Sequence, residues 1–275
     1  MRDAAMTNYL KPMLRDQALA MNMESDFNLA QTALPANIKL LEGLVLSYPS
    51  RRDLKVWVSE ALCGYGFGFV EDNDKKRASM LYLRAKEYAV QNAVRHIQFK
   101  AEYIYDINEF EKWLSKRSEK DIDILYWLGH SWGAYIAINL NNPDAMADLP
   151  KVRWIMERVI ALDERFYNAG AHLFLGSLYA SIPVMFGGSE EKSLYHFNRG
   201  FSLNGEKFLL AHYYFAKTYC VRFLKKDAFY QSLEYIEQFD TAQYPNLRLF
   251  NSIAVYKADQ LKQQAEELFF DDENF

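Results

Sequence analysis

Cysteine, proline and glycine are scarce in this 275-residue chain, which contains 2, 7 and 12 of them respectively. Cys63 and Cys220 lack the spacing of metal ligands or of a redox pair, so we expect two buried free thiols. The formal charge of −4 argues against a general nucleic-acid binder, because such a protein needs a basic surface to displace counterions from phosphate. No apolar run approaches the roughly 18 residues of a membrane span.

Apolar residues nevertheless make up half of the chain and aromatic residues 16%, which is enough for an extended core. Six of the seven prolines lie between apolar segments of helical period, and strand signals are few. The sequence therefore predicts an all-α fold. The expected helices cover residues 7–23, Pro35 to Pro49, 53–70, 75–97, 121–140, 149–161, 167–181, 190–202, 206–224, 227–239 and 246–269, followed by an acidic tail at 271–273.

The expected helices form pairs, and the first helix of each pair carries small residues four positions apart. Residues at this spacing share one helix face. A glycine inside a helix costs about 1 kcal/mol relative to alanine, so its repeated use indicates that a neighbouring backbone packs closely there. Bulky residues such as Tyr82 and Phe197 on the second helices are the expected complement. The small residues are Gly64 and Gly68; Gly129, Gly133 and Ala137; Gly176 and Ala180; Ala216 and Cys220.

Two of these first helices resemble the tetratricopeptide repeat. Leu128-Gly129 is followed by Trp132, and Leu175-Gly176 by Tyr179, as that repeat requires. The separation of the two glycines exceeds the ideal period of about 34 residues, so we expect irregular repeats with inserted loops such as residues 183–188. The prediction is a single helical-repeat domain over 1–275, an irregular α-α superhelix. Its parts are N-terminal helices (1–50), about four tetratricopeptide-like pairs (53–240) and a C-terminal helix (246–269).

The segment from Gly129 to Gly133 matches the Gly-x-Ser-x-Gly nucleophile elbow of α/β-hydrolases, in which Ser131 would attack an ester carbonyl. The apolar residues around it keep helical period through the motif, whereas an elbow interrupts that period. The sequence also lacks the buried parallel strands and the glycine-rich oxyanion loop of a hydrolase. A serine hydrolase is therefore the weaker alternative to a protein without catalytic residues.

Cofactor and metal motifs are not found. The glycines of residues 63–69 follow no expected strand and precede no Lys-Ser/Thr pair, so they do not predict a phosphate loop. No set of His, Cys, Asp and Glu has the spacing of metal ligands. We therefore expect neither a cofactor nor a metal site.

A series of sequence blocks follows in chain order: 34–44, 64–72, 77–89, 149–158, 167–176, 187–188 and 196–197. Together these blocks resemble the TatT family, the T components associated with tripartite ATP-independent periplasmic (TRAP) transporters. The resemblance implies a cryptic tetratricopeptide fold, a homotrimer with internal channels, and association with the substrate-binding P component. It also implies a periplasmic lipoprotein. Because residues 1–6 contain no signal-peptide core, we expect the lipid anchor on an N-terminal segment missing from this chain.

We accordingly expect a non-enzymatic accessory protein of a TRAP-type uptake system that binds the P component. The resemblance also implies that it passes small organic-acid or hydrophobic ligands through an internal channel. A general tetratricopeptide-type scaffold that binds other proteins is the alternative.

The candidate ligand or channel residues are polar and aromatic groups that packing does not require. Asn168 and His172 are four residues apart at an expected helix start, near Tyr179. Trp127 and Trp132 lie on different faces of one expected helix. These groups either line a cavity or cap the helix and satisfy one another in the core, since buried polar groups usually find partners.

Overall fold

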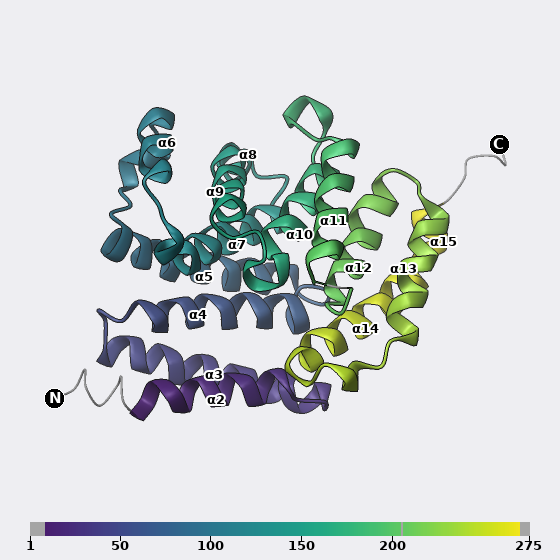
Figure 1. Ribbon diagram of the computed structural model, residues 1–275, viewed down its shortest axis with the longest axis horizontal. Helices are drawn as coiled ribbons and strands as arrows, with labels where there is room; N and C mark the ends of the chain where they lie inside the picture. The colour runs from purple at the N-terminus through teal and green to yellow at the C-terminus, as the bar shows by residue number, and fades with distance from the viewer. Residues whose placement is uncertain (1–8, 205, 270–275) are drawn as a thin grey trace. The chain divides into compact units, whose positions relative to one another are not determined.

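The computed structural model describes residues 9–204 and 206–269, and the regular elements of this part of the chain are all helices (Figure 1). The predicted all-α fold is thus confirmed. The helices group into two compact units: a central unit of residues 31–166, and a terminal unit formed by residues 1–30 and 167–275. The expectation of one repeat domain stays a prediction. The predicted helix start at Thr7 and the acidic tail at 271–273 lie outside the described residues.

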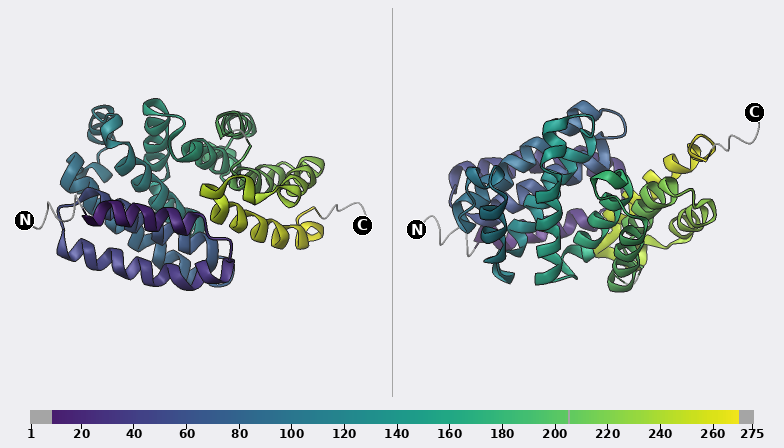
Figure 2. Two further views of the ribbon diagram at one scale, coloured as in Figure 1. Left: turned by 60° about the horizontal axis from the view of Figure 1, so that its bottom comes forward. Right: turned by 90° about the horizontal axis from the view of Figure 1, so that it is seen from above.

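The central unit consists of helices that pack in chain order. α4 packs against α5, α5 against α7, and α7 against α9, as can be followed in Figure 1 and from two other sides in Figure 2. Its core is formed by large side chains such as Trp132, Tyr126 and Phe110. The helices are α3 (Phe27–Ser47, which begins before the unit), α4 (Arg52–Tyr65), α5 (Lys75–Ile97), α6 (Ile107–Ser115), α7 (Ile122–Ile138), α8 (Pro143–Ala147) and α9 (Leu149–Leu162).

The terminal unit is built in the same way from shorter helices. α12 packs against both α13 and α14, and α14 also contacts α2. Phe197 and Phe229 are fully buried in its core. The helices are α2 (Lys11–Asn22), α10 (Phe166–Ser181), α11 (Glu190–Asn204), α12 (Leu210–Tyr214), α13 (Lys226–Gln238), α14 (Arg248–Gln263) and α15 (Ala265–Leu268).

Pro35 does not begin a helix, and the prediction that it does is wrong. It lies inside α3, which starts eight residues earlier at Phe27. The Asp26 carboxylate accepts hydrogen bonds from the backbone N–H groups of Asn28 and Leu29, at 2.9 and 3.0 Å, and so caps the new N-terminus. Proline costs the helix one backbone hydrogen bond. Burial of an apolar stripe along the helix outweighs that cost; the stripe is Ala30, Leu34, Ile38, Leu41 and Val45.

Two helices change from α to π geometry. α4 continues as a π-helical segment, Gly66–Val70, and α12 as Phe215–Cys220. The wider hydrogen bonds that span five residues include Glu71 N–H to the Gly66 carbonyl at 2.9 Å. In both cases the segment falls where the sequence predicts the first helix of a pair to continue, so the helix extends as expected but with one added residue in a turn.

Glycine provides the close packing that the sequence predicts, at most of the positions described. A Cβ atom on Gly129 would lie 2.9 Å from Cγ2 of Ile155, and one on Gly176 would lie 2.9 Å from the Phe197 ring. Gly64, by contrast, faces open space, so the prediction that it accommodates a neighbour is wrong. Gly66, two residues later, instead lies against the Tyr82 ring, at 2.7 Å from its notional Cβ.

α6 is the longest helix that the sequence analysis does not predict. Its nine residues are fewer than the roughly 11 over which helical periodicity is recognised in a sequence. The Asp106 carboxylate caps its N-terminus by accepting from Asn108 N–H and Glu109 N–H. Phe110 and Trp113 are buried, and Trp113 Nε1 donates to the Ile97 carbonyl at 2.8 Å. Tertiary packing therefore fixes this helix.

Candidate functional site

His172 and Tyr179, two of the predicted ligand residues, meet His196 in the terminal unit. The Nδ1 atoms of His172 and His196 lie 2.9 Å apart, and the Tyr179 ring stacks on His196 with centroids 5.6 Å apart. His172 is 1% exposed and Tyr179 4%. Burial, together with the charges of His172 and Lys192, lowers the pKa of His196 to about 4. The cluster is a neutral, largely buried contact between α10 and α11.

Asn168 does not share a helix face with His172, so the basis for pairing them is wrong. Tyr167, Asn168 and Ala169 have φ values of 49°, 57° and 58°, which place all three in the left-handed region. The four-residue spacing requires a right-handed helix throughout. Each left-handed non-glycine residue costs about 1–2 kcal/mol. Surrounding structure must stabilise this turn, and Ala169 is accordingly buried while the Tyr167 ring packs edge-on against Phe250.

Trp127 and Trp132 belong to α7 of the central unit and lie in its core. They are 4% and 0% exposed. The Trp127 ring contacts Tyr126 and His130, with centroids 5.2 Å away in each case. Burial lowers the pKa of His130 to about 4. The predicted ligand residues therefore form two groups, one in each unit, and a ligand-binding role for Asn168, His172, Tyr179, Trp127 and Trp132 stays a prediction.

A polar cluster that the sequence analysis did not identify surrounds Trp132. Its Nε1 donates to Asp148 Oδ2 at 3.2 Å, and Lys151 donates to Asp148 Oδ1 at 2.9 Å. The Lys86 ammonium lies 4.3 Å from the centroid of the Trp132 ring and 4.0 Å from Asp148 Oδ2. One carboxylate thus joins α5, α7 and α9 at the edge of the core. Sequence spacing gives no signal for it, because the residues come from separate helices.

Ser131 does not form a nucleophile elbow, and the hydrolase hypothesis is contradicted. The residue lies in the middle of α7 and is fully buried. Its hydroxyl donates to the Trp127 carbonyl at 2.6 Å, one turn back along the helix. An elbow requires a strand before the serine, and the described residues contain none. The glycines of this motif instead allow α9 to pack closely on α7.

An ordered apolar loop joins α10 and α11, at the position where the sequence predicts an insertion. Val184, Met185 and Phe186 are 81%, 83% and 58% exposed. The Pro183 carbonyl accepts from the N–H groups of Phe186 and Gly188, at 2.9 and 3.1 Å. Position 188 requires glycine, because a Cβ there would lie 2.0 Å from the Ile182 carbonyl oxygen. Three consecutive exposed apolar side chains are unusual on a protein surface and indicate a contact site.

Among the helices of residues 9–204 and 206–269, none has both the length and the apolar character to cross a membrane. The same residues contain no group of three His, Cys, Asp or Glu side chains placed to hold a metal ion. The geometry is that of an all-helical protein with close-packed helix pairs, buried histidines and one prominent apolar loop. This class of architecture is typical of proteins that bind other proteins and small ligands.

The comparison with known sequences places the chain in one such family. The family model of TAtT, the TRAP transporter T-component, matches residues 23–269, and the chain belongs to this family. It is also similar to an uncharacterized protein of Treponema pallidum (strain Nichols), with 24% identity over 267 residues that cover 90% of this chain and 82% of the relative. The resemblance found in the sequence is thereby confirmed, and with it the assignment to a transporter accessory component.

Proposed function

We propose that this protein is the non-enzymatic T component that binds the solute-binding P component of a TRAP transporter. The observation that carries the proposal is the family match, which extends over residues 23–269 and so includes most of both compact units. An accessory component of a transporter must contact another component, and a contact needs an exposed complementary surface.

The loop of Val184, Met185 and Phe186 supports that role and is the contact surface that we assign to the P component. Its backbone is held by hydrogen bonds within the loop, so binding would cost little conformational entropy. Its apolar side chains already face solvent and would be buried by a partner.

Calorimetric titration with the P component of the same transporter tests the proposal. Met185→Glu should weaken binding at least about tenfold, because a charge would have to be buried in the contact. Tyr105→Glu is the matched control, since Tyr105 is 91% exposed and lies in the other unit; it should leave affinity unchanged. Absence of binding by the wild type would contradict the proposed function. Full binding by Met185→Glu would contradict only the assigned surface.

We also propose, from the family resemblance, a periplasmic location, a lipid anchor on a preceding segment, and assembly as a homotrimer with internal channels. Membrane fractionation of the full-length gene product tests the anchor, and light scattering tests the trimer. A monomer at concentrations well above those in the cell would contradict the trimer. Small organic acids or hydrophobic molecules are the ligands proposed for the channels.

A further inference from the structure

Met185 is the most exposed methionine of residues 9–204 and 206–269. Its side chain is 83% exposed, compared with 62% for Met13 and 58% for Met80. Oxidation of a methionine thioether to the sulfoxide converts a flexible apolar side chain into a polar one. A dissolved oxidant must reach the sulfur atom, and at Met185 solvent already does. The centre of the apolar loop is therefore open to this reaction.

The loop does not need the Met185 side chain to hold its shape. Its backbone is fixed by hydrogen bonds between main-chain atoms. Gly188 N–H donates to the Pro183 carbonyl at 3.1 Å, and just after the loop Ser189 N–H donates to the Tyr179 carbonyl at 3.0 Å. A sulfoxide oxygen on Met185 would remain in water, so we expect oxidation to leave the loop folded.

Met156 of α9 is the opposite case. It is 0% exposed, and its Sδ atom would lie only 3.4 Å from a Cβ on Gly129 of α7. An oxygen on this sulfur would have neither space between the two helices nor water to hydrogen-bond it. The core thus protects Met156 from oxidants, and oxidation of the exposed Met185 can occur without damage to the core.

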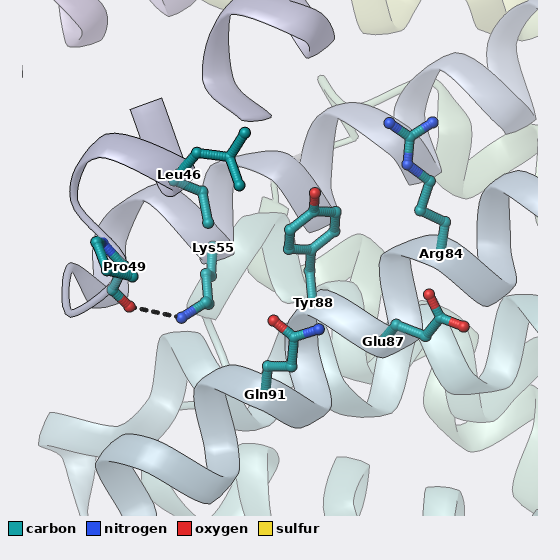
Figure 3. Close-up of a pocket in the computed structure, with 8 residues that line it drawn as sticks. Leu46, Pro49, Lys55, Arg84, Glu87, Tyr88 and Gln91 are labelled. Atoms are coloured by element: carbon teal, nitrogen blue, oxygen red, sulfur yellow. Dashed lines mark hydrogen bonds between the residues drawn. The ribbon is translucent and has the colours of Figure 1, made fainter. Parts of the chain in front are cut away.

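Met80 is an exposed methionine of the central unit and provides a matched control. It lies on α5, one helical turn before Arg84. Figure 3 shows Arg84 at one end of a cavity of about 450 Å³, with Pro49 at the other end. Met80 and the loop methionine Met185 are both accessible to a dissolved oxidant. They differ in position, so only the oxidation of Met185 should change the apolar loop.

We propose that Met185 is a reversible oxidation site that controls binding of the P component. The Sδ lone pair attacks one oxygen of hydrogen peroxide, so that an S–O bond forms and the O–O bond breaks. The second oxygen takes up the proton of the first and leaves as water. The sulfur loses two electrons and the peroxide gains them.

The sulfoxide oxygen is a hydrogen-bond acceptor that an apolar partner surface would have to desolvate without compensation. The oxidised loop therefore binds weakly. Reduction by two thiols, which form a disulfide and release water, restores the thioether, and methionine sulfoxide reductases catalyse this step. The inference rests on the proposed function for the identity of the partner.

Peptide mapping by mass spectrometry, after treatment of the whole chain with hydrogen peroxide, tests the chemical part. Met185 should be oxidised at least about tenfold faster than Met156. Circular dichroism should stay unchanged when Met185 is fully converted. Added P component should slow the oxidation of Met185 but not that of Met80. Equal rates for Met185 and Met156, or loss of helical signal on conversion of Met185, would overturn the assignment.

Calorimetric titration with the P component, before and after peroxide treatment, tests the control of binding. The affinity of the wild type should fall at least about tenfold on oxidation and recover after treatment with reductases for both sulfoxide epimers. Met80→Leu should respond as the wild type does. Met185→Leu, whatever its affinity beforehand, should keep that affinity after treatment, because leucine has no sulfur. No loss in the wild type, or an equal loss in Met185→Leu, would overturn the inference.

Retention on a hydrophobic-interaction column provides a readout that does not need the P component. Peroxide should reduce the retention of Met80→Leu, which keeps the loop methionine, more than that of Met185→Leu. Equal reductions would overturn the inference even if the P component did not bind. Absence of binding by the untreated wild type would contradict the proposed function instead, so the two failures are distinguishable.

Discussion

The Nδ1 atoms of His172 and His196 lie 2.9 Å apart, so one of these nitrogens carries a hydrogen and the other accepts it. Two imidazolium rings in this arrangement would place hydrogen against hydrogen and charge against charge. The contact between α10 and α11 therefore requires that at least one ring be neutral.

This relationship predicts a loss of stability in acid. The folded-state pKa of His196, about 4, is below its ordinary value of 6.5, so the unfolded chain binds the proton more readily. The contribution of neutral His196 to the free energy of unfolding is complete above about pH 6.5 and is lost as pH falls through about 4. The loss amounts to roughly 2 kcal/mol after allowance for partial exposure of the ring. His196→Phe should reduce the acid dependence. Thermal unfolding between pH 7 and 4 measures this acid dependence of stability. An NMR titration that gives His196 a pKa near 6.5 would contradict the prediction.

Substitution of the two kinds of helix glycine should change stability in opposite directions. Gly129→Ala places a methyl group 2.9 Å from Ile155 and 3.1 Å from Met156, so we expect destabilisation by about 1–2 kcal/mol. Gly64→Ala meets no neighbour and should stabilise the same unit by about 0.5–1 kcal/mol through helix propensity. Urea unfolding measures both. Equal effects of the two substitutions would mean that helix propensity alone determines how stability changes when these glycines are replaced.

The left-handed turn before α10 predicts a stabilising glycine. Ala169 has a φ of 58°, so Ala169→Gly should relieve strain and raise stability by about 1 kcal/mol. Ala171→Gly is the control, because Ala171 lies in the regular part of the helix and should lose about 1 kcal/mol. Thermal denaturation distinguishes the two, and a fall in melting temperature for both variants would show that the turn is not strained.

Asp148 should contribute more than an ordinary surface carboxylate. Asp148→Asn keeps a side-chain oxygen that can accept from Trp132 Nε1 but leaves Lys86 and Lys151 without a negative partner. We expect the free energy of unfolding to fall by about 1–3 kcal/mol. Glu109→Gln removes an exposed pair with Lys112 and should cost less than about 0.5 kcal/mol. Urea unfolding compares them. A similar small cost for both would show that the cluster is screened by solvent.

Much of the fold follows from local sequence. The bounds of α5, Lys75–Ile97, match the prediction because Asp74 supplies a capping carboxylate that accepts from Arg77 N–H, and because small and aromatic residues recur at helical spacing. Gly129 likewise predicts that a neighbouring helix packs closely on α7, and α9 does so. The first feature depends on residues close together in the chain, and the second on a small residue whose spacing the local sequence displays.

The unpredicted features depend on distant contacts. Nothing near Pro35 indicates that burial will retain a helix around it, and nothing near Asn168 indicates three left-handed residues. The burial of Lys55 shows the same limitation. A lysine at the start of a helix is normally solvated, and its burial beneath Pro49 and α5 arises only from the assembled helices.

The π-helical turns of Gly66–Val70 and Phe215–Cys220 have a consequence for natural and engineered variation. Each of these turns contains one residue more than an α-helical turn would. Deleting one residue within the turn would leave a continuous α-helix in which the residues that follow keep nearly their present faces, because the π turn already holds one residue more than an α turn. Deletion of a single residue at these two places would therefore preserve the alignment of the helix faces, whereas the same deletion elsewhere in α4 would rotate the residues that follow by about 100° and misalign the buried stripe.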